Sequence, residues 1–305
     1  MRLPNSRGQK ASHEIPFDRP VEPWHDPVDG VAHLDSIFET LKRFIAAKPE
    51  VLRAATLWTS FTWFIDDVRV APLAIITSPE KRCGKTLLST LMSRLCRDPL
   101  LASNISPSAL FRSIEKWKPT LILDETDTFL KENEDLRGLI NSGHTQNTAF
   151  VIRCSGDNHE PTQFNPFGAK LLAGIGNLPE TIMDRAVVLR LRRKKPDEKM
   201  ERIRKTPDAL FDELCHKQAR FSADHSKTIA ESNPAIPENL NDREQDNWEP
   251  LLAIADAVGG HWPETARCAA VELSQTEDDQ SSIAIQLLSD ICLLYTSPSP
   301  RDTLL

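Results

Sequence analysis

Hydrophobic and polar positions follow two different periods along this chain. Apolar residues recur at helical spacing over residues 37–45 and 49–65. Between Pro72 and Leu191, short apolar runs of strand length alternate with amphipathic stretches of helical length. Beyond Pro196 the strand pattern stops and only the helical period remains. The pattern therefore predicts an α/β core with a parallel sheet, two preceding helices and a C-terminal all-helical domain.

The expected elements divide the chain into three parts and a tail. Residues 1–30, rich in Pro, Asp, His and Gly, show no periodicity and are expected to form a disordered or loosely packed arm. Residues 31–195 form the predicted core with its preceding helices, and residues 196–291 form the predicted helical domain. Strands are expected at residues 72–77, 100–103, 119–124, 149–154, 169–175 and 186–191. Later helices are expected at residues 85–96, 106–117, 134–141, 179–184, 199–204, 209–231, 242–258 and 264–273.

The last residues are expected to be foreign to the protein. Residues 292–302, Cys-Leu-Leu-Tyr-Thr-Ser-Pro-Ser-Pro-Arg-Asp, can be back-translated into a transposon-type sequencing adapter. They also hold Tyr295, the only tyrosine of the chain. An ordinary tail rich in Ser and Pro is the alternative. We interpret residues 292–305 as a sequencing artefact, so the natural protein is expected to be cut off near Ile291.

The composition limits the classes of protein to which this chain can belong. No apolar run approaches the roughly 18 residues that a membrane span requires, and residues 1–20 lack the apolar core of a signal peptide. We therefore expect a cytoplasmic protein without a membrane partner. Six cysteines form no CxxC pair and have no histidine at ligand spacing, so neither a zinc site nor a disulfide framework is indicated. The net charge of −7 argues against a surface that is basic throughout, although a local basic strip is compatible with it.

A strand, a tight loop and a helix start follow one another between Leu73 and Thr86, in the order that a phosphate-binding loop requires. Backbone amides at the helix N-terminus can face the β-phosphate of ATP, and Gly84 leaves room for close approach of the backbone. Lys85 can bridge the β and γ oxygens, and the Thr86 hydroxyl can hold Mg²⁺. The expected ATP contacts are Ser78, Pro79, Glu80, Lys81, Arg82, Cys83, Gly84, Lys85, Thr86 and Leu87.

One position of this loop departs from the usual GxxxxGK[ST] pattern, which begins with glycine. Here that position is Pro79, which has a restricted φ and no backbone N–H. The turn must therefore differ at its entrance. A Gly-Lys-Thr tripeptide alone is weak support for a nucleotide site, because chance or a simple helix N-terminus also explains it.

A second motif, in which an apolar strand ends in adjacent carboxylates, lies at Thr120–Asp127. In a Walker B motif of this form, Asp124 orients the shell of Mg²⁺ and Glu125 polarises the attacking water. A buried strand that ends in acidic loop residues is the alternative. Together with the Gly-Lys-Thr loop, the acidic pair favours a site that binds and hydrolyses ATP.

Two further positions suit a motor ATPase. Asn177 follows the strand at residues 169–175 and can hydrogen-bond the γ-phosphate or the attacking water, as a sensor-1 residue does. Its alternative role is that of a turn residue before Pro179. Arg185 lies between a short helix and a strand, where it can act as an arginine finger on the nucleotide of a neighbouring subunit. An internal salt bridge with Asp184 is the alternative for Arg185.

The sequence also offers two places where nucleic acid can bind. Residues 190–205 hold nine Lys or Arg against three Asp or Glu, which suits a phosphate backbone, although a solvated strand edge and helix face is the commoner explanation. The hairpin-like region 144–153, between the Walker B motif and the sensor strand, is the better place for a pore loop. Five tryptophans with apolar neighbours are expected to pack in the core rather than stack on bases: Trp58, Trp63, Trp117, Trp248 and Trp262.

Several segments together resemble a known family: the uncharacterised conserved domain, a domain of unknown function, of phage, plasmid and bacterial primase-helicase-like P-loop proteins. The resemblance covers roughly residues 20–290 and is carried by residues 78–86, 101–115, 119–130, 136–144, 178–193 and 241–264. That family also has proline at the first position of the loop, which removes the objection to Pro79. The resemblance implies an AAA+ or superfamily 3 helicase-like ATPase in the DNA replication of mobile elements, often joined to a primase module.

These observations lead to one expected function and two alternatives. The expected function is that of a ring-forming homo-oligomer that hydrolyses ATP with Mg²⁺ and acts on single- or double-stranded DNA as a helicase, translocase or primase-associated ATPase. The first alternative is an AAA+ switch that remodels protein partners, which the acidic net charge suits. The second is a module that binds nucleotide without turnover, against which Glu125 argues.

Overall fold

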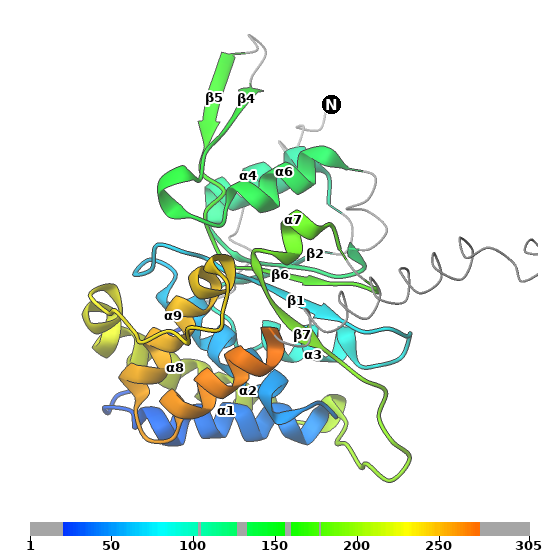
Figure 1. Ribbon diagram of the computed structural model, residues 1–305, viewed down its shortest axis with the longest axis vertical. Helices are drawn as coiled ribbons and strands as arrows, with labels where there is room; N and C mark the ends of the chain where they lie inside the picture. Colours follow the sequence, from blue (N-terminus) through cyan, green and yellow to red (C-terminus); the bar gives the residue numbers. More distant parts are fainter. Residues whose placement is uncertain (1–20, 103–104, 127–132, 156–159, 177, 275–305) are drawn as a thin grey trace, which may run out of the picture.

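A five-stranded parallel sheet forms the centre of the molecule (Figure 1). The computed structural model describes residues 21–102, 105–126, 133–155, 160–176 and 178–274. Its sheet has the order β2-β3-β6-β1-β7, and every neighbouring pair is parallel. The strands are β1 (Leu73–Thr77), β2 (Pro99–Ala102), β3 (Thr120–Leu123), β6 (Lys170–Ala173) and β7 (Ala186–Arg190). The predicted α/β class with a parallel sheet is confirmed.

The register of the strands brings their carboxyl ends to one edge of the sheet. Ile75 of β1 lies opposite Leu172 of β6 and Val188 of β7. Leu172 in turn lies opposite Leu123, the last residue of β3. In open parallel sheets, ligands bind in the crevice outside the carboxyl ends of the strands. The segments that follow β1, β3 and β6 are therefore neighbours at this edge.

Helices cover both faces of the sheet, because successive strand residues point to opposite sides. Leu73 and Ile75 pack under α4 (Pro107–Trp117), α6 (Glu134–Ser142) and α7 (Glu180–Met183). Ala74 and Ile76 face the other layer, which consists of α1 (Gly30–Phe44), α2 (Pro49–Phe61), α3 (Lys85–Ser93), α8 (Asp208–Ala230) and α9 (Asp242–Val258). Each fully buried Leu or Ile side chain contributes roughly 1.5–3 kcal/mol to this three-layer core.

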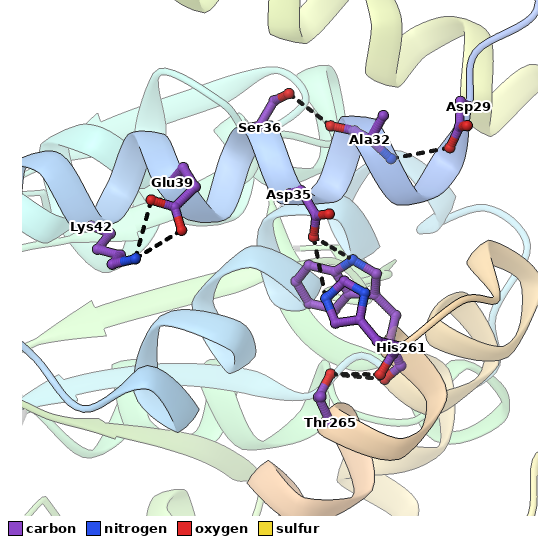
Figure 2. A network of polar contacts seen from close by, with 9 residues as sticks. Asp29, Ala32, Asp35, Ser36, Glu39, Lys42, His261 and Thr265 are labelled. Atoms are coloured by element: carbon purple, nitrogen blue, oxygen red, sulfur yellow. Dashed lines mark hydrogen bonds and ion pairs between the residues drawn. The ribbon is translucent and has the colours of Figure 1, made fainter.

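The helices after the core pack against the helices that precede it. α1 and α2 share one apolar cluster with α8, α9 and a further helix that runs from residue 262 to 274. The indole Nε1 of Trp262 donates to Asp35 Oδ1 of α1 over 3.1 Å, and His261 Nε2 lies 3.3 Å from the same oxygen. Figure 2 shows His261, in the turn that leads into this C-terminal helix, directed at Asp35. The C-terminal helical region is therefore one layer of the same core.

Local sequence signals account for several helix starts. Asp29 caps α1 by accepting a hydrogen bond from Ala32 N (Figure 2). Asn241 and Glu244 form a reciprocal capping box at the start of α9. Residues 21–29 belong to the expected loose arm, yet they lie along α8, where Trp24 N donates to the carbonyl of His216 over 2.9 Å. Four of the five tryptophans expected in the core are buried, and Trp117 is half-buried.

One expected strand belongs to a different sheet. β4 (Val151–Ser155) does not join the parallel sheet; it pairs antiparallel with β5 (Glu160–Phe164) in a hairpin that projects beyond α4 and α6 (Figure 1). The sequence did not predict β5, because its residues Glu-Pro-Thr-Gln-Phe lack apolar alternation and include Pro161. The two strands of the hairpin, residues 151–155 and 160–164, overlap only the last three residues of the region 144–153 in which it was expected. Similarly, the helix expected at 199–204 is only a 3-10 turn, η3 (Ile203–Lys205).

Within the described part of the chain, no helix has both the length and the apolar character that crossing a bilayer demands.

Candidate functional site

The loop between β1 and α3 has the backbone form of an anion-binding loop. Gly84 is the N-cap residue of α3, with φ 88° and ψ 15°, and Arg82 also has a positive φ of 65°. A Cβ added to Gly84 would meet Ile45 Cδ1 at an ordinary 3.7 Å, so the left-handed backbone and not lack of space requires glycine. Gly84 has no side chain with which to cap α3, and among the described residues no side-chain capping hydrogen bond to its first turn is seen. Such a helix N-terminus favours a bound anion.

Lys85 folds back over this loop. Its Nζ donates to Ser78 Oγ over 2.8 Å and to the Glu80 carbonyl over 3.4 Å. Both acceptors are neutral, so among the described residues no carboxylate is seen to hold this ammonium. The positive charge of Lys85 therefore lies at the mouth of the loop without a paired carboxylate among the described residues. An incoming anion can replace the two neutral acceptors.

The loop entrance differs from a glycine turn in the way that Pro79 requires. Ser78 is buried, and its hydroxyl donates to the Glu80 carbonyl over 2.6 Å, which bridges the proline with a side chain. The Ser78 carbonyl accepts from Gly176 N over 3.4 Å. Serine side chains make such turns by replacing a backbone donor. The missing N–H of Pro79 is thus compensated by its neighbour.

The remaining loop residues divide into exposed and packed positions. The side chains of Pro79, Glu80, Lys81, Arg82 and Thr86 are exposed. Cys83 is buried, with Sγ 3.9 Å from the Lys81 carbonyl, and Leu87 packs partly against the core. Thr86 thus presents its hydroxyl to solvent in the first turn of α3, whereas Cys83 and Leu87 can contribute only backbone to a ligand.

Asp124 and Glu125 follow β3 in a strained turn. Glu125 has a φ of 58°, a left-handed conformation that costs an L-residue about 1–2 kcal/mol. Asp124 Oδ1 accepts from Glu125 N over 2.9 Å, and the next side chain, Thr126, is buried and donates to the Ala173 carbonyl over 3.0 Å. The turn leaves Asp124 half-buried and Glu125 exposed. Backbone strain of this kind gathers at functional sites.

β6 joins the two motifs by hydrogen bonds at its carboxyl end. Thr77 Oγ1, at the end of β1, donates to the Gly176 carbonyl over 2.7 Å, and Gly174 N donates to Ile76 O over 3.1 Å. On the other side of β6, Thr126 holds Ala173. One strand thus separates the loop from the acidic pair, a spacing of about 10 Å. Asn177, the expected sensor residue, lies outside the described residues.

A hollow of about 330 Å³ borders the loop. It is lined by Lys48, Val51, Thr77, Ser78, Pro79, Gly176, Arg190, Leu191, Arg192 and Leu273. Its volume and its mixture of apolar and basic side chains suit a small anionic molecule. A larger hollow of about 590 Å³ lies at the amino ends of β3 and β6, beside Thr120 and Ala169. Of these two hollows, the smaller one borders the loop and is the candidate site for a ligand.

Arg185 lies at the amino ends of the strands, opposite the loop and the acidic pair. Its carbonyl accepts from Leu73 N, the first residue of β1, over 2.9 Å. The five residues of β1 therefore separate Arg185 from the loop, a span of about 16 Å. Its Nη1 donates to the Thr181 carbonyl over 2.6 Å. Burial and the nearby Arg243 lower the pKa of Arg185, and Asp184 opposes them. Arg185 cannot reach the loop of its own chain.

A polar network that no sequence pattern predicted supports the segment around Arg185. His144 Nε2 lies 2.8 Å from Asn247 Oδ1, and Asn247 Nδ2 donates to the Asp184 carbonyl over 2.9 Å. Since the amide nitrogen of Asn247 is used by Asp184, its oxygen must accept, so His144 carries the proton on Nε2. Burial lowers the pKa of His144, which keeps the ring neutral. The network ties α9 to the segment that carries Arg185.

Among the described residues, no group of three or more His, Cys, Asp or Glu side chains gathers as a metal site. The expected magnesium site does not depend on such a group, because Mg²⁺ commonly takes one or two carboxylates and keeps several waters. The side chains of Thr86 and Asp124 carry oxygen atoms of the kind that this ion prefers.

Comparison with known proteins places the C-terminal part of the chain in context. Residues 190–304 match a family described as "Protein of unknown function (DUF3631)". The matched range begins at the last residue of β7, so it includes neither the loop at residues 78–86 nor the acidic pair. It also runs through the segment from residue 292 that we interpret as a sequencing artefact, and that interpretation stays a prediction.

A relative in Saccharopolyspora erythraea, described as "Uncharacterized 28.9 kDa protein in xis 5'region", is 35% identical over 103 residues. The match covers 33% of this chain and 38% of that protein. Both comparisons are consistent with an uncharacterised family, and neither description includes an activity.

Proposed function

We propose that this chain is a magnesium-dependent ATP hydrolase that works on DNA. One observation carries the proposal: hydrogen bonds through β6 join the loop that holds Lys85 to the turn that holds Asp124 and Glu125. A phosphate loop and an acidic pair one strand apart place a binding group and a hydrolytic group on the two sides of one nucleotide.

Binding of ATP relies on the loop backbone and Lys85. The first-turn amides of α3 donate hydrogen bonds to the phosphate oxygens, and the ammonium of Lys85 moves from Ser78 to the β and γ oxygens. The hollow beside Val51, Leu191 and Leu273 accommodates the base and ribose. Thr86 and Asp124 would hold Mg²⁺, which supplies neutralisation of phosphate charge.

Hydrolysis relies on Glu125. Its carboxylate is exposed beside Asp124, at the carboxyl edge where the γ-phosphate would end. There it orients a water molecule and accepts its proton, a role worth about 10²–10⁴-fold in rate. The Asp124 carboxylate accepts from Glu125 N, whereas the Glu125 side chain is exposed, so Asp124 would face the metal ion and Glu125 the attacking water.

Arg185 acts on a neighbouring subunit in this proposal. It lies about 16 Å from its own loop, at the far edge of the sheet, so it can stabilise transition-state charge only in trans. Contact between one edge of a subunit and the opposite edge of the next is a head-to-tail interface, which generates a closed ring when the rotation permits.

The projecting β4–β5 hairpin is compatible with either of two substrates, DNA or a protein. Phe150, just before it, is 53% exposed, and Ile152 within it is 63% exposed. In a DNA motor these side chains contact the strand or its bases. The same apolar pair also suits a protein partner, which favours a remodelling ATPase as the second candidate function.

ATP hydrolysis with and without single-stranded DNA tests the proposal. Stimulation by DNA that is lost in Glu125→Gln supports the DNA motor. Hydrolysis that ignores DNA but responds to a protein substrate supports the second candidate. If neither Lys85→Ala nor Glu125→Gln changes the rate, the site assignment is wrong.

A further inference from the structure

A long loop follows β7 and holds most of the basic run seen in the sequence. Residues 191–202 contain no helix or strand, and we call them the basic loop. Figure 1 shows the segment after β7 as an extended excursion at one end of the long axis of the molecule, while the β4–β5 hairpin stands at the other end. The basic loop is thus a surface separate from the hairpin.

The positive side chains of this region are presented to solvent. Arg193, Lys194, Lys195, Lys199 and Arg202 of the basic loop are all exposed, and so are Arg204 and Lys205 immediately after it. The chain has a net charge of −7, whereas this segment is locally positive. Such a patch raises the local concentration of a polyanion.

Two of the three carboxylates in this region are already paired. Glu198 accepts from Arg192 Nη1 over 2.9 Å and from Lys195 N over 2.8 Å. Glu201 is held by Arg43 of α1, over 2.7 Å and 2.9 Å. These pairs fold the loop and tie its end to α1. These hydrogen bonds use Arg side chains and the backbone of Lys195, and the side chains of Lys194, Lys195 and Lys199 are exposed.

The exposed side chains indicate which kind of polyanion fits. The exposed residues 192–197 are Arg-Arg-Lys-Lys-Pro-Asp, without an aromatic or large aliphatic side chain. The centre of a protein–protein interface is enriched in such apolar groups and depleted of charge. Binding of a nucleic-acid backbone, by contrast, is dominated by Lys and Arg contacts to phosphates. The composition of the loop therefore favours nucleic acid over a folded protein partner.

The root of the basic loop adjoins the nucleotide site. Leu191 and Arg192 line the same hollow as Ser78 and Pro79 of the phosphate loop. We propose that the basic loop binds the phosphate backbone of single-stranded DNA, without reading base sequence. The exposed charges of the loop support DNA binding by themselves. Only the use of this surface by a DNA motor rests on the proposed function.

The test uses the full chain and a fluorescein-labelled single-stranded oligonucleotide, with affinity followed by anisotropy between 50 and 200 mM salt, a range of about fourfold. The loop variant carries Arg193→Ser, Lys194→Ser and Lys195→Ser. A control variant removes three equally exposed charges elsewhere, with Arg112→Ser and Lys116→Ser on α4 and Lys227→Ser on α8.

We expect the loop variant to bind about tenfold more weakly or worse, and its log–log salt slope to fall by about 2, since each lost single-strand phosphate contact removes roughly 0.7. The control variant should keep the slope. Equal losses in the two variants would reduce the effect to net charge and overturn the proposal. Tighter binding of an acidic polypeptide than of the oligonucleotide would also overturn it.

ATP binding, measured on the same samples with a fluorescent analogue, separates the two proposals. A loop-dependent oligonucleotide affinity in a protein that does not bind the analogue would leave the basic loop standing and refute the ATPase. Binding of the analogue without any oligonucleotide binding would refute DNA binding by the basic loop and leave the proposed ATP site standing. Circular dichroism of both variants checks that a loss does not arise from unfolding.

Discussion

The substitution Gly84→Ala tests whether the loop conformation matters for ATP. A methyl group at this position meets Ile45 Cδ1 at 3.7 Å, an ordinary contact, so the substitution adds no clash. It changes only the backbone preference at a φ of 88°. The left-handed region costs an L-residue about 1–2 kcal/mol.

This cost should appear in nucleotide affinity. Without a ligand the alanine loop relaxes away from the left-handed form, so ATP must restore that form when it binds. We expect the dissociation constant to rise by about 5–30-fold, the equivalent of 1–2 kcal/mol. The assay is a titration with a fluorescent ATP analogue in the presence of Mg²⁺, alongside thermal unfolding of the free protein.

Gly138→Ala is the matched control. Gly138 lies inside α6, and an added Cβ there meets nothing within 4 Å. Alanine in a helix interior is more stable than glycine by roughly 0.5–1 kcal/mol, so this variant should melt slightly higher and bind the analogue normally. An unchanged affinity in Gly84→Ala would refute the assignment of this loop to phosphate binding.

Three more outcomes are expected. Burial lowers the pKa of His33 to about 4, so the unfolded chain binds the proton first, and stability falls by about 3 kcal/mol as the pH drops from 6.5 to 4. The free energy of unfolding in urea should depend less on pH in His33→Gln than in the unmodified chain. The same pH dependence in both proteins would contradict the lowered pKa of His33. Gly143→Ala should lower the melting temperature by several degrees, because its methyl group collides with the Pro166 carbonyl and Lys170 Nζ; an unchanged value would contradict the packing. Mixing Arg185→Ala with Glu125→Gln subunits should restore part of the ATPase rate, and no recovery would count against a finger that works in trans.

The strands and the two motifs could be predicted because each rests on local sequence. Gly84–Thr86 follow the end of β1 after six residues, and Asp124 and Glu125 follow β3 directly. Each strand and its motif therefore lie in one short stretch of sequence. Parallel pairing then brings their ends together. The capping box of α9 is local in the same way.

Contacts between residues that are far apart in the sequence could not be predicted from it. His144 and Asn247 are 103 positions apart, and their pairing depends on how α9 docks against the sheet. The hollow beside the loop combines Val51 with Leu273, which no pattern connects. β5 escaped for a different reason, because antiparallel pairing with β4 stabilises a segment whose own residues have little strand preference.

Equilibrium binding of ATP to the unmodified chain and to Lys85→Ala tests the nucleotide site most directly. Loss of the ammonium removes a charge-assisted hydrogen bond to phosphate, worth about 1.5–3 kcal/mol. We predict magnesium-dependent binding by the unmodified chain and an affinity lower by about ten- to a hundredfold in Lys85→Ala, with Glu125→Gln still binding but not hydrolysing. Equal ATP affinity in the unmodified chain and Lys85→Ala would contradict the site.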